Sequence, residues 1–177
     1  WELPAGYCAL VPGDPEAEAR LDAVFGSGVS RQHGTAVSAA PCGDAGRPDA
    51  LRSGAARLVV LALREPVIRN RAAFLENWTS QFQSNPLMAY GMVWDLQGRD
   101  ENAAYVALSP APSLPLSVRR PPPPPDPYLC MDVAVTAVRG WEVWASFVRR
   151  CLPGEAVDQA GQAMLRPLAA DIVRENQ

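Results

Sequence analysis

The feature that most constrains this chain is the spacing of its last two cysteines around one short turn. Residues 130–138 (CMDVAVTAV) and 143–151 (VWASFVRRC) are rich in Val, Thr and aromatic residues, which is typical of strands. Residues 139–142 (RGWE) separate them, and a Gly-X pair at their centre predicts a two-residue type II′ turn. That turn places Cys130 directly opposite Cys151 on a non-hydrogen-bonded site, where Cα atoms lie about 4.5 Å apart.

A second pairing supports the same strand register, because that register places Asp132 opposite Arg149 as a cross-strand pair of opposite charge. We therefore predict a disulfide between Cys130 and Cys151 at the open end of a C-terminal β-hairpin. The alternative is a pair of buried free thiols whose spacing matches by chance.

The other two cysteines, Cys8 and Cys42, pair by elimination, and each lies in or next to a predicted strand. No C-x-x-C motif or nearby histidine is present, so the spacing argues against a zinc or thioredoxin-like site. Two disulfides indicate an oxidising compartment, and we expect a periplasmic or secreted protein. The first residue is Trp1 rather than Met, which by itself fits removal of a signal peptide or a trimmed domain boundary, and with two disulfides we expect a cleaved signal peptide.

Composition narrows the class of protein further. The chain has 177 residues, 48% of them hydrophobic, which is enough for one globular domain with a sizeable core. Its net charge of −3 comes from 19 acids and 16 scattered bases, a pattern that argues against nucleic-acid binding. No run approaches 18 apolar residues, so we expect no transmembrane segment.

Hydrophobic periodicity and turn residues predict alternating strands and helices upstream of the hairpin. Strands are expected at 7–11, 35–41, 58–63, 89–96 and 103–108, the last two joined by a polar turn over 97–102. Helices are expected at 15–25, which Asp14 caps, at 71–83 and at 155–175, where Pro167 interrupts the run. A helical turn is expected over 49–53. This order predicts an α+β fold, a mainly antiparallel sheet packed with helices as a sandwich.

Half of the prolines fall between 110 and 127, and five of them are consecutive. Such a run favours a stiff polyproline II segment and cannot join a sheet. A domain linker is the alternative, but about 50 residues follow it, and these offer little core on their own. We therefore expect a single domain over 1–177 that contains 110–127 as a long loop.

Candidate catalytic groups each have a simpler explanation. His33 is the only histidine and lies in a polar loop, and no Gly-x-Ser-x-Gly elbow is present. Asp95, Asp100 and Glu101 gather around one turn, where Asp is common for conformational reasons. Residues 77–79 (NWT) match the glycosylation pattern, which we interpret as chance. We expect no catalytic residue, no metal and no cofactor, and hence no enzyme.

Two features suggest a contact surface with a protein partner. Trp141 is expected to be exposed at the hairpin tip, while Trp144 belongs to an apolar face of the core. The apolar rings of the proline run are a second candidate interface, although a passive connector is an equal alternative. These candidate interface residues are Trp141, Pro121, Pro122, Pro123, Pro124 and Pro125.

Three stretches resemble a class of small secreted bacterial proteins of unknown function. They are residues 3–10 (LPAGYCAL), 99–105 (RDENAAY) and 135–140 (VTAVRG). These proteins are similar at the level of fold to the PsbP-type sandwich, and the proline run departs from that pattern. The resemblance implies a non-catalytic subunit or assembly factor attached to a larger complex.

Three functions follow as expectations. The leading one is an exported, non-catalytic accessory protein that docks on a larger, membrane-associated or soluble assembly. The alternative is a protein that binds a small molecule or lipid between sheet and helices, in a pocket lined by Trp78, Phe82 or Trp144. The third is a hydrolase that uses His33. The oligomeric state is left open.

Overall fold

A computed structural model describes residues 2–9, 33–45, 57–63, 70–82, 87–89, 92–110, 129–151 and 159–176. The predicted helix at 15–25, the helical turn at 49–53 and the prolines at 121–125 lie outside these residues.

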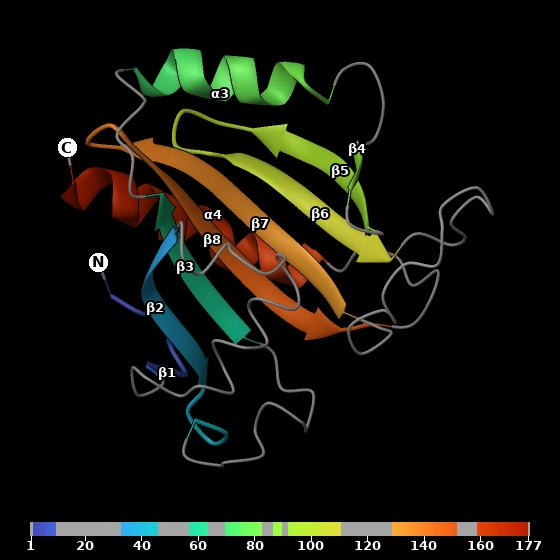
Figure 1. Ribbon diagram of the computed structural model, residues 1–177. Helices are drawn as coiled ribbons and strands as arrows, with labels where there is room; N and C mark the ends of the chain where they lie inside the picture. Colours follow the sequence, from blue (N-terminus) through green and yellow to red (C-terminus); the bar gives the residue numbers. More distant parts are fainter. Residues whose placement is uncertain are drawn as a thin grey trace.

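The described residues form one antiparallel sheet of eight strands, in the order β1-β2-β3-β8-β7-β6-β5-β4 (Figure 1). The chain lays down β1 to β3 side by side, moves to the far edge, and returns through β4 to β8 until β8 pairs with β3. The strands are β1 (Tyr7–Ala9), β2 (His33–Pro41), β3 (Arg57–Leu63), β4 (Leu87–Ala89), β5 (Met92–Arg99), β6 (Ala104–Pro110), β7 (Leu129–Val138) and β8 (Trp141–Arg150).

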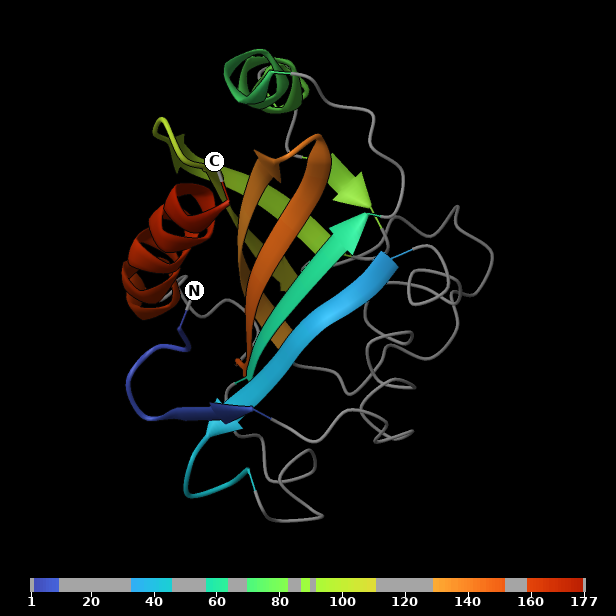
Figure 2. The ribbon, with the colours of Figure 1, turned by 90° about the vertical axis from the view of Figure 1, so that its left-hand side faces the viewer.

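Two helices pack on the sheet from opposite faces (Figure 2). Helix α3 (Arg71–Ser80) contacts β5, β6 and β7, and helix α4 (Gln159–Glu175) contacts β7 and β8. The antiparallel sheet with packed helices agrees with the predicted α+β class. The sheet has one strand more than expected, because the short strand β4 precedes β5 at the edge.

Alternation along the central strands divides the apolar residues between two cores. Tyr105 and Ala134 face α4 and pack against Leu165 and its neighbours, whereas Val106 and Val133 face the other way, toward α3. Every residue of Ala103–Leu108 and Cys130–Val138 is buried. The middle of the sheet is therefore covered on both faces.

The turn between β7 and β8 differs from the predicted one. Val138 pairs with Trp141, so Arg139 and Gly140 form the turn, with φ angles of 49° and 84°. Two positive φ angles identify a type I′ turn, not the expected type II′ turn centred on Gly140 and Trp141. The register is shifted by two residues, and a shift of two leaves every side chain on its original face. The hydrophobic pattern is the same for both registers and cannot distinguish them.

This shift corrects two predicted pairings. Cys130 lies opposite Arg149, and Asp132 lies opposite Phe147, where it is buried. Cys151 follows the end of β8, yet it bonds diagonally to Cys130 with a Cα–Cα distance of 5.6 Å. The predicted partners are thus bonded, while their predicted position directly across the ladder is wrong.

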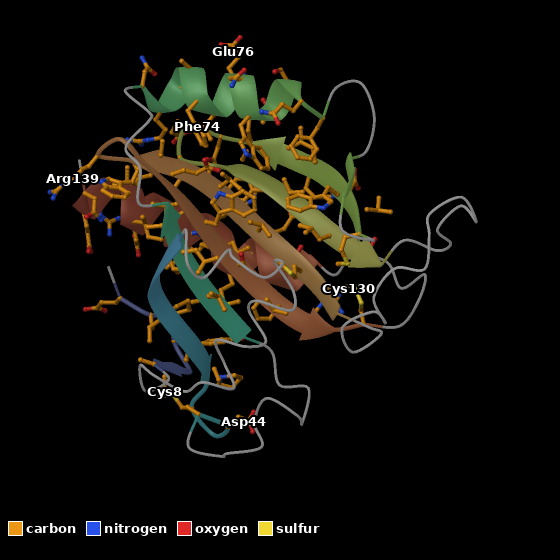
Figure 3. The ribbon with its side chains drawn as sticks, viewed as in Figure 1. Cys8, Asp44, Phe74, Glu76, Cys130 and Arg139 are labelled. Atoms are coloured by element: carbon orange, nitrogen blue, oxygen red, sulfur yellow. A yellow bond between two sulfur atoms is a disulfide. The ribbon has the colours of Figure 1, made fainter. Side chains whose placement is uncertain are left out.

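The second disulfide joins Cys8 to Cys42 and ties the edge strand β1 to the end of β2. It differs from the first in exposure, because Cys42 is exposed whereas Cys130 and Cys151 are only 5% and 4% exposed. Figure 3 labels Cys8 and Cys130, which lie in separate parts of the sheet.

Several predicted element boundaries also move. Residues 97–99 belong to β5, so the turn to β6 is shorter than the expected 97–102. Asp100 forms this turn by accepting hydrogen bonds from the backbone N–H groups of Asn102 and Ala103, at 2.8 and 3.0 Å. Helix α3 ends at Ser80, three residues before the predicted end.

Helix α4 approaches the sheet most closely at Gly161. A Cβ atom added there would lie 2.2 Å from Oδ2 of Asp132 and 2.8 Å from Cδ1 of Phe147. Both distances are shorter than real Cβ contacts, so only glycine allows this approach. Glycine inside a helix otherwise destabilises it by about 1 kcal/mol relative to alanine. The seating of α4 on β7 and β8 thus explains why Gly161 is tolerated.

We predict that Gly161→Ala lowers the free energy of unfolding by roughly 1–3 kcal/mol, because Asp132 and Phe147 must shift. Helix propensity alone predicts the opposite sign. Gly43→Ala is the control, since its new Cβ meets nothing within 4 Å. Urea denaturation followed by circular dichroism measures both variants. A Gly161→Ala protein as stable as the parent would contradict the described approach of α4.

The difference in exposure predicts an order of reduction for the two disulfides. Limiting dithiothreitol under native conditions should open Cys8–Cys42 before Cys130–Cys151, because Cys42 is an exposed residue whereas Cys130 and Cys151 are both buried from an attacking thiolate. Alkylation followed by peptide mapping identifies which thiols have been released. Release of Cys130 and Cys151 first, or at the same rate, would show that the exposures are wrong.

Candidate functional site

Helix α3 is fixed to the sheet at its first turn. The side chain of Asn70 caps the helix by accepting a hydrogen bond from the Ala73 N–H at 3.1 Å. Next to it, Nε of Arg71 donates to the carbonyl oxygen of Ala137 on β7, also at 3.1 Å. The start of α3 is therefore held beside the closed end of β7 and β8.

The rest of α3 rests on aromatic side chains. Phe74 and Trp78 are four residues apart, which places them on one side of the helix, and Phe82 follows two residues after the helix ends. Figure 3 shows Phe74 directed from α3 toward the sheet and Glu76 directed away from it. Below them the sheet contributes Trp94 from β5 and Trp144 from β8. We call these five residues the aromatic cluster.

The rings of the aromatic cluster meet edge to face around Trp144. The ring centroids of Trp78 and Trp144 are 6.1 Å apart at an interplanar angle of 87°, and those of Trp94 and Trp144 are 6.0 Å apart at 80°. Phe82 lies 4.8 Å from Trp78 in a tilted arrangement. Such contacts contribute about 0.5–1.5 kcal/mol per pair beyond the area that they bury.

Each ring of the aromatic cluster is only partly buried, although the cluster lies against a fully buried layer of Val106, Leu108, Met131, Val133 and Val135. Three of the five tryptophans of the chain meet here. Partly exposed aromatic rings backed by a rigid apolar layer are typical of surfaces that bind apolar ligands or partners.

The two tryptophans that the sheet contributes differ in the hydrogen bonding of their indole N–H groups. Nε1 of Trp144 donates a hydrogen bond of 2.6 Å to Oε1 of Glu142, two residues earlier on β8. Burial raises the pKa of the Glu142 carboxyl, and this hydrogen bond opposes the effect in part. Nε1 of Trp94 is buried and has no hydrogen-bond partner within the described part of the chain.

Trp141, the one sequence-predicted interface residue that the structure describes, does not belong to the aromatic cluster. Trp141 is half-buried as the first residue of β8, paired with Val138, and is not exposed at the turn as expected. Residues 121–125 lie outside the described residues, and so does the side chain of His33, whose backbone begins β2. The hypothesis of a hydrolase based on His33 therefore stays untested.

The acidic residues around the β5–β6 turn do not form a common site. Besides its two backbone partners, Asp100 accepts hydrogen bonds from the Tyr105 hydroxyl at 2.8 Å and from Arg166 at 3.4 Å. Burial acts to raise the pKa of the Asp100 carboxyl, but these hydrogen bonds and the nearby guanidinium lower it below its ordinary value. Asp95 bonds instead to Gln97, and Glu101 is exposed. Asp100 thus stabilises a turn.

The structure also places the glycosylation pattern and allows a search for metal-binding groups. Asn77, of the glycosylation pattern, lies exposed on α3, where the Thr79 hydroxyl donates to the carbonyl oxygen of Leu75 at 2.8 Å. Among the described residues, no group of three His, Cys, Asp or Glu side chains is arranged to hold a metal ion.

Sequence reasoning identified part of the aromatic cluster. Trp78, Phe82 and Trp144 were expected beside an apolar pocket, and the structure brings the three together. Trp94 and Glu142 were not singled out. The signal for Trp94 is the alternation of Trp94 and Leu96 with the polar Asp95 and Gln97 along β5, which assigns Trp94 and Leu96 to one face.

Comparisons with protein-family models, with curated proteins and with solved structures find no match. The expected similarity to PsbP-type proteins is therefore neither supported nor refuted. In the described part of the chain, neither helix has the length and apolar character needed to cross a bilayer.

The raised pKa of Glu142 predicts a dependence of stability on pH. In the unfolded chain this carboxyl ionises near its ordinary pKa of 4.5, whereas in the folded protein it holds its proton to higher pH. Its contribution to the free energy of unfolding is therefore fully present below pH 4.5 and is lost as the pH rises through the raised value.

Glu142→Gln removes this titration and keeps an oxygen that accepts from Trp144. Relative to the parent, the variant should gain in free energy of unfolding between pH 4 and pH 7, as measured by urea denaturation at each pH. A difference between the two proteins that is the same at both pH values would contradict the burial of Glu142.

Proposed function

We propose that this chain is a non-catalytic binding protein of an oxidising compartment, and that it binds a small apolar molecule at the aromatic cluster. The observation that carries the proposal is the partly exposed group of tryptophans between α3 and the sheet. Edge-to-face rings leave ring faces unstacked, and a flat apolar molecule stacks favourably on such faces.

The way in which α3 is held also supports binding at this place. The helix is short, and of its residues only Leu75 and Thr79 are buried. Its hydrogen bond to β7 comes from Arg71 at the first turn, whereas its last turn carries Trp78, whose ring contacts those of Phe82 and Trp144. Moving rings that are held by dispersion contacts to admit a ligand costs less free energy than breaking a ladder of hydrogen bonds.

The two disulfides support the choice of compartment. Disulfides persist in the periplasm, outside the cell and in the secretory lumen, and the cytosol keeps thiols reduced. We propose export on this basis, in agreement with the expectation from the sequence.

A second candidate function is the accessory subunit of a larger assembly. The observation that favours it is the half-buried Trp141, which follows the exposed Arg139 by two residues at the closed end of β7 and β8. Trp and Arg are the residues most enriched at the centres of protein interfaces. In this case the ligand is a protein surface, and the aromatic cluster serves only to seat α3.

Titration with N-phenyl-1-naphthylamine, a neutral fluorescent probe, tests the first candidate. The oxidised protein should bind one equivalent in a saturable manner, with energy transfer from tryptophan. Phe82→Ala should weaken binding roughly tenfold, because about half of a phenyl contact is lost. Circular dichroism checks that the variant is folded.

Trp141→Ala is the matched control, since Trp141 is also a half-buried aromatic residue but lies outside the aromatic cluster. It should leave probe affinity unchanged. No saturable binding, or an equal loss in Trp141→Ala and Phe82→Ala, would exclude the aromatic cluster as a ligand site. Copurification of a protein partner that Trp141→Ala abolishes would favour the accessory role.

A further inference from the structure

Two indoles of the aromatic cluster touch each other but differ in their hydrogen bonding. Trp144 donates its N–H to Glu142 at 2.6 Å, whereas the N–H of Trp94 is buried and finds no acceptor among the described residues, although the two ring centroids are only 6.0 Å apart. Buried indole N–H groups normally have a hydrogen-bond partner, because a buried N–H without one loses the hydrogen bond that it would make to water.

The position of this N–H indicates how an acceptor would reach it. The Trp94 residue is partly exposed while its Nε1 atom is buried, so the polar end of the indole lies on the covered part of the ring. An acceptor that bonds to it must therefore be inserted beneath the exposed part of the ring. A molecule bound in that way has an apolar body and a single oxygen at its inner end.

The charge at the site restricts the acceptor further. Glu142 carries a carboxylate that burial already disfavours, as its raised pKa shows, and this carboxylate is joined to Trp144 in the same cluster. A second anionic group beside it would be repelled in a medium of low dielectric. A neutral carbonyl oxygen accepts the hydrogen bond without that penalty.

We propose that the Trp94 Nε1–H is the hydrogen-bond donor to a neutral carbonyl oxygen of an apolar ligand inserted into the aromatic cluster. The ligand class is thus a ketone, ester or amide with an apolar body, rather than a carboxylate or a pure hydrocarbon. This inference rests on the proposed function and specifies the ligand for it.

Two isosteric probes test the hydrogen bond separately from apolar contact. They are 2-acetylnaphthalene, which carries a carbonyl group, and 2-isopropenylnaphthalene, in which a CH₂ group replaces that oxygen. Equilibrium dialysis gives the affinity of each for the oxidised protein. The measured quantity is the ratio of the two affinities, because it cancels the ring contacts that the probes share.

Trp94→Phe removes the N–H and keeps an aromatic ring. The ratio of ketone to alkene affinity should fall roughly tenfold in this variant, the worth of one net hydrogen bond. Trp144→Phe is the matched control, because its N–H is already occupied by Glu142. It should weaken both probes alike and leave the ratio at its parental value.

The indole N–H resonance gives a direct readout. In ¹H–¹⁵N spectra, the Trp94 signal, assigned as the one absent from Trp94→Phe, should move downfield with the ketone and stay nearly unchanged with the alkene. An unchanged ratio in Trp94→Phe, or equal shifts with both probes, would overturn the proposed donor while leaving an apolar site intact. Failure of both probes and of N-phenyl-1-naphthylamine to bind would overturn the proposed function as well.

Discussion

The burial of the central strands on both faces is the constraint on which the rest of this structure depends. Strands β6 and β7 are buried along almost their whole length, and their side chains alternate between two separate cores. Each face must be covered, and one helix covers each. The chain reaches both faces because it moves from β3 to the far edge through α3, and adds α4 only after β8 has joined β3.

The two helices meet this constraint in different ways. Helix α4 lies so close to β7 and β8 that it needs a glycine above Asp132, and its apolar residues Leu165, Ile172 and Val173 are almost fully buried. Helix α3 stands off the sheet on large rings that stay partly exposed. One face is thus closed by a helix in tight contact, through a glycine and buried aliphatic residues. The other is closed by aromatic residues with ring surface to spare, and we place binding there.

Much of the fold follows from pattern alone, and the exceptions have physical causes. The buried run of β3, the strands at 130–138 and 143–151 and the aromatic stripe of α3 are strong periodic signals, and all three appear near the expected residues. The turn was predicted two residues away from the observed one at Arg139 and Gly140, because a shift of two residues leaves every side chain on the same face of the sheet. Only the type of turn then distinguishes the two registers. Strand β4 is only three residues long and carries no periodic signal.

Part of the aromatic cluster could also be predicted from hydrophobic periodicity. Trp78, Phe82 and Trp144 belong to apolar faces that periodicity reveals, but their meeting point depends on how the helix lies across the strands. The missing acceptor of Trp94 and the contact of Trp144 with Glu142 depend on side-chain orientation, which no spacing encodes. Trp141 was misplaced because its exposure followed from the wrong turn.

The most direct test of where this protein binds is an isotope-filtered nuclear Overhauser measurement on its complex with N-phenyl-1-naphthylamine. Contacts from probe protons to the indole protons of Trp78 and Trp144, and none to Trp141, are the predicted result. Contacts to Trp141, or to side chains beneath α4 such as Tyr105, would place the ligand elsewhere and contradict a binding site between α3 and the sheet.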